Sequence, residues 1–216
     1  MTITVTAHNK LEFSGTIPVI NPQGPYPIVQ SVSVDDSAGN NNGLADYGES
    51  INIVLNIQNL GTEMIDLLET QMTSDTPWLA VNPGTYTAMN IAPDEAADIS
   101  IPATVGLDAK DGYISVLDIS MQVGEETWQQ NKSLGLHAPD MVLTFVTIDD
   151  EAGGNGNHRL QAGETALIDI TFENQGTADL ANVTFNAQVN DPNLTGLLIN
   201  LGTVSVTAGD ILTAPG

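Results

Sequence analysis

The segment DDSAGNNNGLADYGES, from Asp35 to Ser50, gathers oxygen-bearing side chains around an Asn- and Gly-rich centre. Four of its residues are acidic, and it contains no Lys or Arg. Calcium binds carboxylate, amide and backbone carbonyl oxygens, and it takes several of them from one loop. The composition of this segment therefore predicts a calcium-binding loop, because a bound cation would offset the repulsion between the carboxylates.

The spacing of these oxygens can be compared with the EF-hand loop, in which ligands fall at positions 1, 3, 5, 7, 9 and 12 and a glycine turns the chain at position 6. Placing Glu49 at position 12 puts Gly43 at the turn and Ala38 at position 1. Asp35 or Asp36, just upstream, would have to replace the missing first ligand. The predicted ligands are Asp35, Asp36, Asn40, Asn42, the backbone of Leu44, Asp46 and Glu49.

A second loop repeats this pattern farther along the chain. With Glu164 at position 12, the predicted ligands are Asp149, Asp150, Asn155, Asn157, Gln161 and Glu164. His158 takes the turn position of Gly43, and a histidine can adopt the left-handed backbone conformation at some cost. The second loop has lost the acidic group at position 9 and carries Arg159, so the first loop is expected to bind calcium more tightly.

Two interpretations of these loops stay open. Asn, Asp and Gly favour turns without any ion, so both segments can be plain turns. Recurrence of the Asp pair, the alternate Asn residues and the Gly-Glu step favours calcium. The flanking sequences have the pattern of strands rather than helices, which excludes an EF-hand and places the loops in a β context.

The hydrophobic pattern predicts an all-β protein. Runs rich in Val, Ile, Thr and Phe alternate apolar with polar residues, which is typical of strands. Such runs cover residues 2–8, 28–36, 50–59, 113–123, 141–150, 165–174 and 182–190. Clusters of Gly, Asn, Asp and Pro separate them about every ten residues, a spacing expected of a β-sandwich. The segment from Pro93, PDEAADI, is predicted to be a loop leading into a strand.

Comparison of the chain with itself reveals two copies of one module. Residues 28–62 align with residues 142–177, and both stretches run from a strand through the acidic loop and a second strand to Asn-x-Gly-Thr. A repeat of this length indicates an array of whole domains rather than a solenoid, whose repeats are about 20–50 residues. We predict a first module at 28–138, a second and incomplete one at 139–216, and terminal strands with a Pro-rich linker at 1–27.

The incomplete second module allows two interpretations. The strand-like segments 112–123 and 126–136 of the first module have no counterpart after the second one, while residues 1–20 carry two strand-like runs outside either module. The chain can be a window cut from a longer multidomain protein. Alternatively, the N-terminal strands of one molecule complete the second module of another, which would join copies head to tail into a filament.

Composition excludes several classes of partner. The chain of 216 residues has 4 Lys plus Arg against 27 Asp plus Glu, a formal net charge of −23. Nucleic acids and anionic membranes are therefore not expected as partners, whereas divalent cations are. The sequence has no cysteine. No apolar run is long enough to span a membrane and no signal peptide is evident, so an export signal would have to lie outside this chain.

No catalytic signature occurs in the sequence. The motifs G-x-S-x-G, H-E-x-x-H, Walker A and the dinucleotide fingerprint are missing, and we expect a protein that is not an enzyme. Trp78 and Trp128 would favour an adhesion module that binds carbohydrate or protein if both were exposed on one surface. Packing of Trp78 into the core and of Trp128 on the last strand pair is the alternative.

The repeated Asn-x-Gly-Thr turns carry a family resemblance. The stretches LNIQNLGTEMIDLLETQM and ITFENQGTADLANVTFNAQV resemble CARDB-type immunoglobulin-like modules of secreted bacterial and archaeal proteins. VTAHN with SGTI near the N-terminus is similar to the immunoglobulin-like strand pair that follows the catalytic domain of gingipain-like peptidases. The resemblance implies tandem immunoglobulin-like β-sandwiches with Greek-key antiparallel sheets, in a non-catalytic region of a secreted peptidase or adhesin.

Together these observations predict an extracellular or cell-surface structural protein stabilised by Ca²⁺. Its role would be that of a spacer, stalk or assembly unit. Its expected partners are neighbouring domains of the same or identical chains, including a possible homopolymer, with no nucleic acid and no insertion into a membrane.

Overall fold

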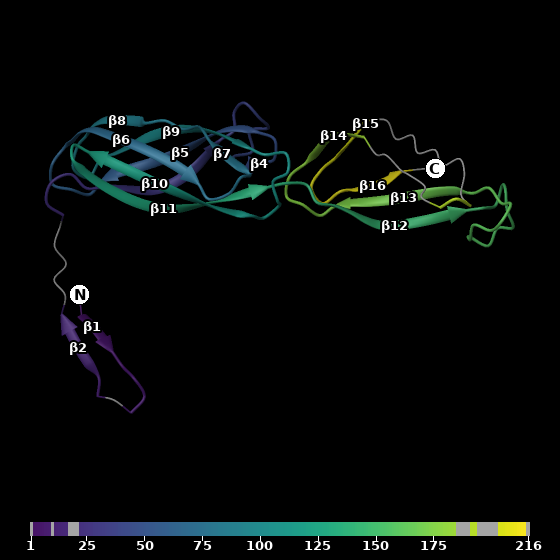
Figure 1. Cartoon of the computed structure of the whole chain (residues 1–216), viewed down its shortest axis with the longest axis horizontal. Coiled ribbons are helices and arrows are strands. Elements are labelled where there is room, and N and C mark those ends of the chain that lie inside the picture. The colour runs from purple at the N-terminus through teal and green to yellow at the C-terminus, as the bar shows by residue number, and fades with distance from the viewer. Residues whose placement is uncertain (1, 10, 17–21, 185–190, 194–202, 215–216) are drawn as a thin grey trace.

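The computed structural model describes residues 2–9, 11–16, 22–184, 191–193 and 203–214. Within these ranges the chain forms sixteen strands and no helix (Figure 1), so the prediction of an all-β protein is confirmed. The same ranges contain no helix with the length and apolar character needed to cross a bilayer. The segment after Pro93 leads directly into a strand, as predicted.

The N-terminal part of the chain is a hairpin. Strand β1 (Thr2–Val5) pairs antiparallel with β2 (Phe13–Thr16), and Thr2 lies opposite Thr16. The apolar side chains of Ile3, Val5 and Phe13 are exposed. The hairpin is therefore stabilised by its strand pairing without a core of its own.

The first module consists of two sheets. Its strands are β3 (Pro27–Asp35), β4 (Ala45–Asp46), β5 (Ser50–Asn59), β6 (Ile65–Ser74), β7 (Leu79–Val81), β8 (Tyr86–Ile91), β9 (Ala96–Val105), β10 (Ile114–Val123) and β11 (Glu126–His137). One sheet has the order β3-β5-β9-β7 and the other the order β4-β11-β10-β6-β8. All pairings are antiparallel except that of β4 with β11.

The core of this module lies between the two sheets. Every second residue of β5 is fully buried, and Ile53 and Leu55 have no exposed surface. The same alternation on β10 buries Leu117, Ile119 and Met121, and all five residues belong to one hydrophobic cluster. The period of two on both strands thus produces two layers that face each other, an arrangement compatible with a β-sandwich.

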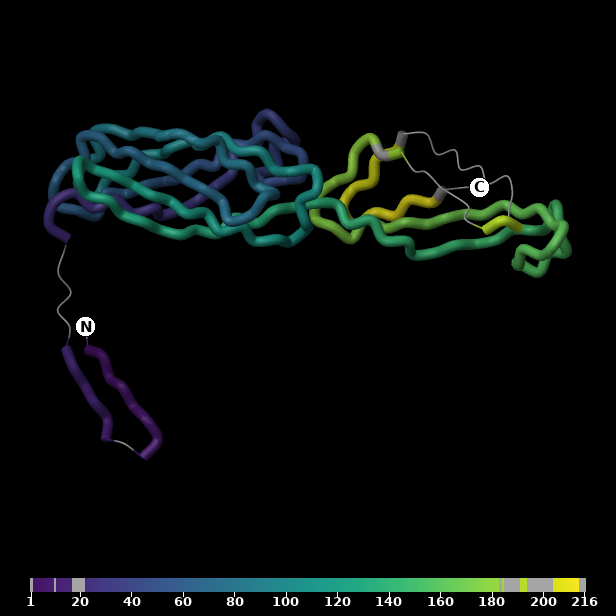
Figure 2. Tube along the Cα trace, viewed as in Figure 1, coloured from purple at the N-terminus to yellow at the C-terminus, as the bar shows by residue number. Residues whose placement is uncertain are grey.

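The second module repeats part of this arrangement. Its strands are β12 (Met141–Asp149), β13 (Leu167–Asn174), β14 (Leu180–Thr184), β15 (Thr203–Val206) and β16 (Ile211–Ala214). They form a sheet of order β12-β13-β16 and a pair β14-β15, which correspond to β3-β5-β9 and β6-β8. Figure 2 shows β11 leading directly into this module. The end of the predicted strand 182–190 lies outside the described residues.

A buried asparagine explains the repeated Asn-x-Gly-Thr turn. The Asn59 Oδ1 atom accepts hydrogen bonds from the N–H groups of Tyr26 (3.1 Å) and Gly61 (2.9 Å), and Nδ2 donates to the carbonyls of Glu63 (2.8 Å) and Ile91 (3.0 Å). These four bonds use the full capacity of the carboxamide. They fasten the entry of the module to the turn after β5 and to the end of β8.

Asn174 makes the same four bonds in the second module. Its oxygen accepts from the N–H groups of Asp140 (3.0 Å) and Gly176 (3.1 Å), and its nitrogen donates to the carbonyls of Ala178 (2.9 Å) and Val206 (3.4 Å). The internal repeat seen in the sequence is therefore also a repeat of tertiary hydrogen bonds.

Asp111 fastens the joint between the modules. Its Oδ1 atom accepts hydrogen bonds from the N–H of Ala138 (3.0 Å) and from both the N–H (3.2 Å) and the hydroxyl of Thr177. Burial raises the pKa of Asp111, but these donors outweigh burial and hold the pKa below its usual value. The joint is therefore held by an ionised carboxylate at neutral pH.

We expect Asn59→Ala to lower the free energy of unfolding of the first module by at least about 2 kcal/mol, because it leaves buried backbone donors and acceptors unpaired. Urea unfolding followed by tryptophan fluorescence measures this, since Trp78 and Trp128 both lie in that module. Asn131→Ala, an exposed asparagine on β11, is the matched control. Equal stability of the two variants would contradict the role of the buried carboxamide.

Candidate metal-binding loops

The first acidic loop connects β3 to β5, and its C-terminal end is held by both sheets. Within it, β4 pairs with the end of β11, so that Asp46 lies opposite His137. The Tyr47 N–H donates to the His137 carbonyl (2.8 Å), and the Gly48 N–H donates to the Val105 carbonyl at the end of β9 (3.0 Å). Both sheets of the module therefore position the carboxylate of Asp46.

Asp36 organises the backbone of the loop. Its buried carboxylate accepts hydrogen bonds from the N–H groups of Asn42 (2.8 Å) and Gly43 (3.1 Å). The chain can fold over Asp36 because Asn41 and Gly43 adopt left-handed conformations, with φ of 59° and 78°. Of the Asp pair at the end of β3, the structure directs the second residue into the loop.

Two carboxylate oxygens in this loop are buried without a hydrogen-bond partner. Asp46 is 3% exposed, and its Oδ2 atom accepts from the side-chain amides of Asn40 (2.7 Å) and Asn42 (2.8 Å), whereas Oδ1 has no partner. The Oε1 atom of Glu49 accepts from the Asn40 N–H (3.1 Å), whereas Oε2 is buried and has none. Buried anionic oxygens without donors are costly, and a bound cation is one kind of group that can satisfy such an oxygen.

Burial and nearby negative charge both raise the pKa of Glu49. Burial raises this pKa above its ordinary value of 4.5, and the charges of Asp46 and Asp36 raise it further. A cation bound at the loop would act in the opposite direction, because it favours the ionised carboxylate.

The second acidic loop has the same backbone arrangement, with Asp150 at its centre. Asp150 accepts hydrogen bonds from the N–H groups of Gly156 (3.1 Å), Asn157 (3.3 Å) and His158 (2.9 Å). Burial raises the pKa of Asp150, but these N–H donors, led by that of His158, hold it below its usual value. His158 has a φ of 60°, which confirms its predicted left-handed conformation.

Gln161 takes the place of Asp46 in this loop. It accepts a hydrogen bond from the Asn155 amide (2.8 Å), and its own N–H donates to Glu164 Oε2 (3.0 Å). Loop 150–164, which the structure describes in full, contains no buried side-chain oxygen without a partner. Of these two equivalent residues, only Asp46 has a buried side-chain oxygen without a partner.

Several of the remaining predicted ligands make local hydrogen bonds. Asp35 and Asp149 stay outside the loops and accept the N–H groups of Ser37 (3.1 Å) and Glu151 (3.0 Å), which stabilises local turns. Leu44 and Arg159 occupy equivalent positions, and their N–H groups donate to the side chains of Asn42 and Asn157, respectively.

In the first loop, the side-chain nitrogens of Asn40 and Asn42, rather than their oxygens, face Asp46. The Oδ1 atoms of Asn40 and Asn42 instead accept backbone N–H groups. Within the described ranges, no group of three or more acidic, His or Cys side chains has the arrangement of a metal site. A calcium ion bound at Asp46 and Glu49 would therefore take no side-chain oxygen from Asn40 or Asn42 unless those carboxamides rotate.

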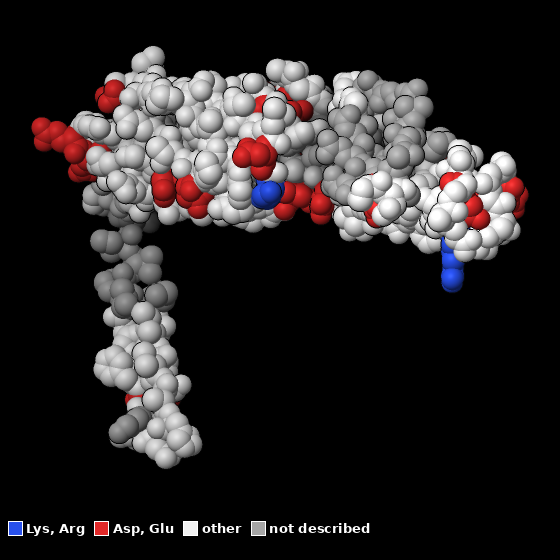
Figure 3. Space-filling view, turned by 45° about the vertical axis from the view of Figure 1, so that its right-hand side comes forward, with Lys and Arg blue, Asp and Glu red and all other residues white. Residues whose placement is uncertain are grey.

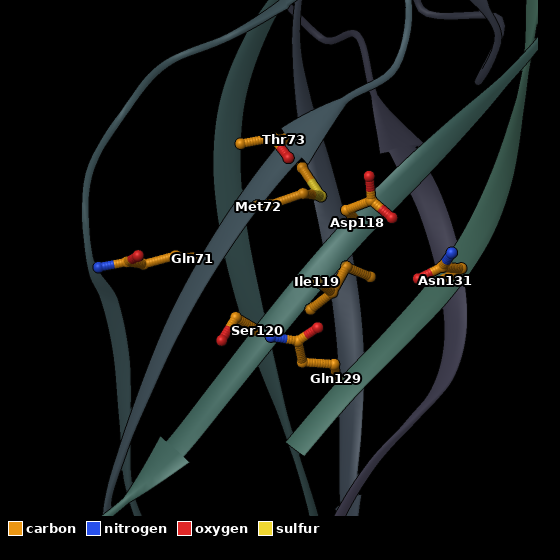
Figure 4. A pocket seen from close by; sticks show the side chains of 8 residues that line it. All are labelled: Gln71, Met72, Thr73, Asp118, Ile119, Ser120, Gln129 and Asn131. Carbon is orange, nitrogen blue, oxygen red and sulfur yellow. The ribbon is translucent and has the colours of Figure 1, made fainter. Parts of the chain in front are cut away.

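A shallow hollow on the outer face of the first module offers little chemistry. Figure 4 shows it over β6, β10 and β11, where Gln71, Thr73, Asp118 and Asn131 line it among other polar side chains. Asp118 is the one carboxylate among its lining residues. A single exposed carboxylate beside amides does not form an acid and base pair.

The two tryptophans do not form one binding surface. Both are half-buried against the core, as the packing alternative predicted. Trp78 meets Tyr113 edge to face at 4.8 Å, near the start of β10, and Trp128 meets Tyr26 at 6.3 Å, beside the end of β10. The strand β10 thus separates them.

Surface charge agrees with the composition. Figure 3 shows acidic side chains spread over the visible face, with basic ones only as isolated points. Comparison with known protein families and with curated proteins gives no match.

In the absence of calcium, we expect Glu49→Gln to stabilise the protein at neutral pH. The folded-state pKa of Glu49 is raised, so its ionisation costs stability as pH rises above its ordinary value of 4.5, and the variant removes this cost. Urea unfolding in EDTA at pH 7 and at pH 4 should show the advantage of the variant shrinking as the pH falls. An exposed control, Glu126→Gln, should show no such change, and an advantage of Glu49→Gln equal at both pH values would contradict the assignment.

Proposed function

We propose that this chain is a non-catalytic structural part of a secreted or cell-surface protein, built from immunoglobulin-like modules and stabilised by calcium. Its role is that of a spacer, a stalk or a unit of an extracellular assembly. The observation that carries the proposal is the pair of buried carboxylate oxygens without partners, on Asp46 and Glu49.

Calcium fits this loop better than other cations. The candidate ligands are oxygens only, because the sequence has no cysteine and the first loop has no histidine. Calcium accepts six to eight oxygens in flexible geometry, and extracellular modules bind it at about 10⁻⁴–10⁻³ M. An ion held by Asp46 and Glu49 would tie the loop to the ends of β9 and β11, because both strands already hold the loop backbone.

The arrangement of the modules supports a role as a spacer. The first module has two sheets over one core, which is consistent with the immunoglobulin-like assignment. The second module follows β11 after three residues, and Asp111 bonds to both Ala138 and Thr177 at the joint. Modules in series with a fastened joint suit a protein that holds other parts at a distance.

The two alternative functions are an adhesion module and a filament subunit. An adhesion module for carbohydrate or protein is less well supported, since Trp78 and Trp128 pack on separate tyrosines. A subunit of a head-to-tail filament is supported by a specific observation, the incompletely covered apolar face of the second module.

Thermal unfolding with excess calcium and with EDTA tests the calcium proposal. Calcium at about 100 times its Kd adds about 2.7 kcal/mol, which should raise the midpoint of the wild-type protein by roughly 10–20 °C. Asp46→Asn with Glu49→Gln keeps the size of both side chains and should abolish most of this rise. The matched change in the second loop, Gln161→Ala with Glu164→Gln, should leave most of it.

Identical midpoints of the wild-type protein in calcium and in EDTA would overturn the calcium proposal. The two loops would then be turns that need no ion.

A further inference from the structure

The second module has an apolar face that the first module keeps covered. Leu143 on β12 is 53% exposed, whereas its counterpart Val29 on β3 is 2% exposed. On the next strand, Ile168 and Ile170 are only half-buried, although their counterparts on β5 are completely buried. The same sequence pattern therefore leaves apolar surface exposed in one module and buries it in the other.

The first module shows what covers this face. There the hairpin of β10 and β11 lies over β3 and β5, and it buries Leu117 and Ile119 in the shared core. Its second strand also reaches β3 directly, because the side chain of Gln130 accepts a hydrogen bond from the Val29 N–H (3.0 Å). A hairpin of this kind is thus the natural cover for the face of β12 and β13.

The hairpin of β1 and β2 has the matching sequence. Ile3 and Val5 precede Leu117 and Ile119 by 114 residues, and both pairs alternate with polar residues. Gly24 and Ala138 are related by the same offset. The carbonyl of each accepts a hydrogen bond from the Asn-x-Gly-Thr turn of the module that follows it in the chain. The β1–β2 hairpin thus precedes the first module in the chain at the same distance as the β10–β11 hairpin precedes the second module.

The strand register also places the second strand of this hairpin. Val5 pairs with Phe13 in the N-terminal hairpin, and Ile119 pairs with Gln130 in the first module. Phe13 therefore takes the place of Gln130, which lies over Val29. Phe13 is 69% exposed, and its expected neighbour at the second module, Leu143, is also apolar and exposed.

We propose that the β1–β2 hairpin of one copy of this chain covers the open face of the second module of another copy. Ile3 and Val5 then pack toward Ile168 and Ile170, and Phe13 packs on Leu143. The partner is a second copy because the described residues of each chain include one exposed apolar face and one exposed hairpin of matching pattern. The inference deepens the proposed role as an assembly unit and does not depend on calcium.

The connectivity makes this exchange head to tail. The N-terminal hairpin joins the first module at the start of β3, which lies beside the start of β11. The second module joins at the opposite end of β11. Since the two complementary surfaces are attached at opposite ends of the first module, successive copies add in one direction and form an open chain.

Disulfide trapping tests the contact in the full chain, which has no native cysteine. Phe13→Cys and Leu143→Cys are prepared as separate variants, mixed and mildly oxidised. We expect a covalent heterodimer as the main product on a non-reducing gel, and a ladder of longer products from the double variant. Thr4→Cys mixed with Leu143→Cys is the control, because Thr4 lies on the opposite face of β1 and should give little product.

Light scattering of charge variants provides the second measurement. The wild-type mass should rise with concentration, whereas Ile3→Asp with Val5→Asp should stay near the monomer mass of 22.7 kDa. Thr2→Asp with Thr4→Asp adds the same charge to the opposite face and should assemble like the wild type, since Asp118 already occupies the position that matches Thr4. The hairpin lies outside the core of the first module, so the unfolding of that module should be unchanged in all variants.

Three results would overturn the inference. One is a failure of Phe13→Cys and Leu143→Cys to cross-link more than the control pair. Another is a double variant that forms only an internal disulfide, which would show a chain covering its own second module. The third is a wild-type mass that stays monomeric at all concentrations. If one of these results occurs but calcium still raises the thermal unfolding midpoint, only the hairpin exchange is overturned. If the variants cross-link but calcium does not raise that midpoint, only the calcium proposal is overturned.

Discussion

A fully hydrogen-bonded carboxamide at the end of the second long strand holds each module together. Asn59 and Asn174 are completely buried, and each uses both its donors and its acceptor on backbone groups from three separate segments. A side chain that leaves any of these groups unpaired would cost free energy, so the position accepts few alternatives. The entry of each module and the turn after its second long strand are consequently fixed in one geometry.

The two sheets of the first module hold the acidic loop in place and bring its carboxylates close together. The two sheets hold Asp46 in a buried position through β4, and Asp36 folds the backbone around it. The result places three carboxylates near one another without any basic residue in the loop. The pKa of Glu49 is raised, first by burial and then by the charges of Asp46 and Asp36, and one oxygen of Asp46 and one of Glu49 remain buried without a partner. In the second loop a glutamine at the equivalent position avoids the problem.

The two modules also show that a strand pattern does not by itself produce a core. β5 and β13 have the same alternation of apolar residues, yet only the first strand has its apolar side chains completely buried. The difference lies in the hairpin of β10 and β11, which closes the first module from the opposite sheet. The described residues thus include a partly exposed apolar face on the second module and an exposed apolar hairpin that precedes the first module.

The sequence by itself determined the all-β class, the positions of most strands and the internal repeat. The alternation of apolar residues and the recurrence of Asn-x-Gly-Thr are local signals, and neither needs knowledge of distant contacts. It also located both acidic loops and the left-handed turn at His158, because the spacing of turn residues is a property of the local chain.

Tertiary structure decided which of those oxygens are available to an ion. Sequence spacing could not distinguish Asp36 from Asp35, nor could it show that the oxygens of Asn40 and Asn42 accept backbone N–H groups. The burial of Asp46 comes from β9 and β11, which lie far from the loop in the sequence. Hydrogen-bond partners and desolvation depend on such long-range packing, so the chemical state of the loop follows from the fold, whereas its location follows from the sequence.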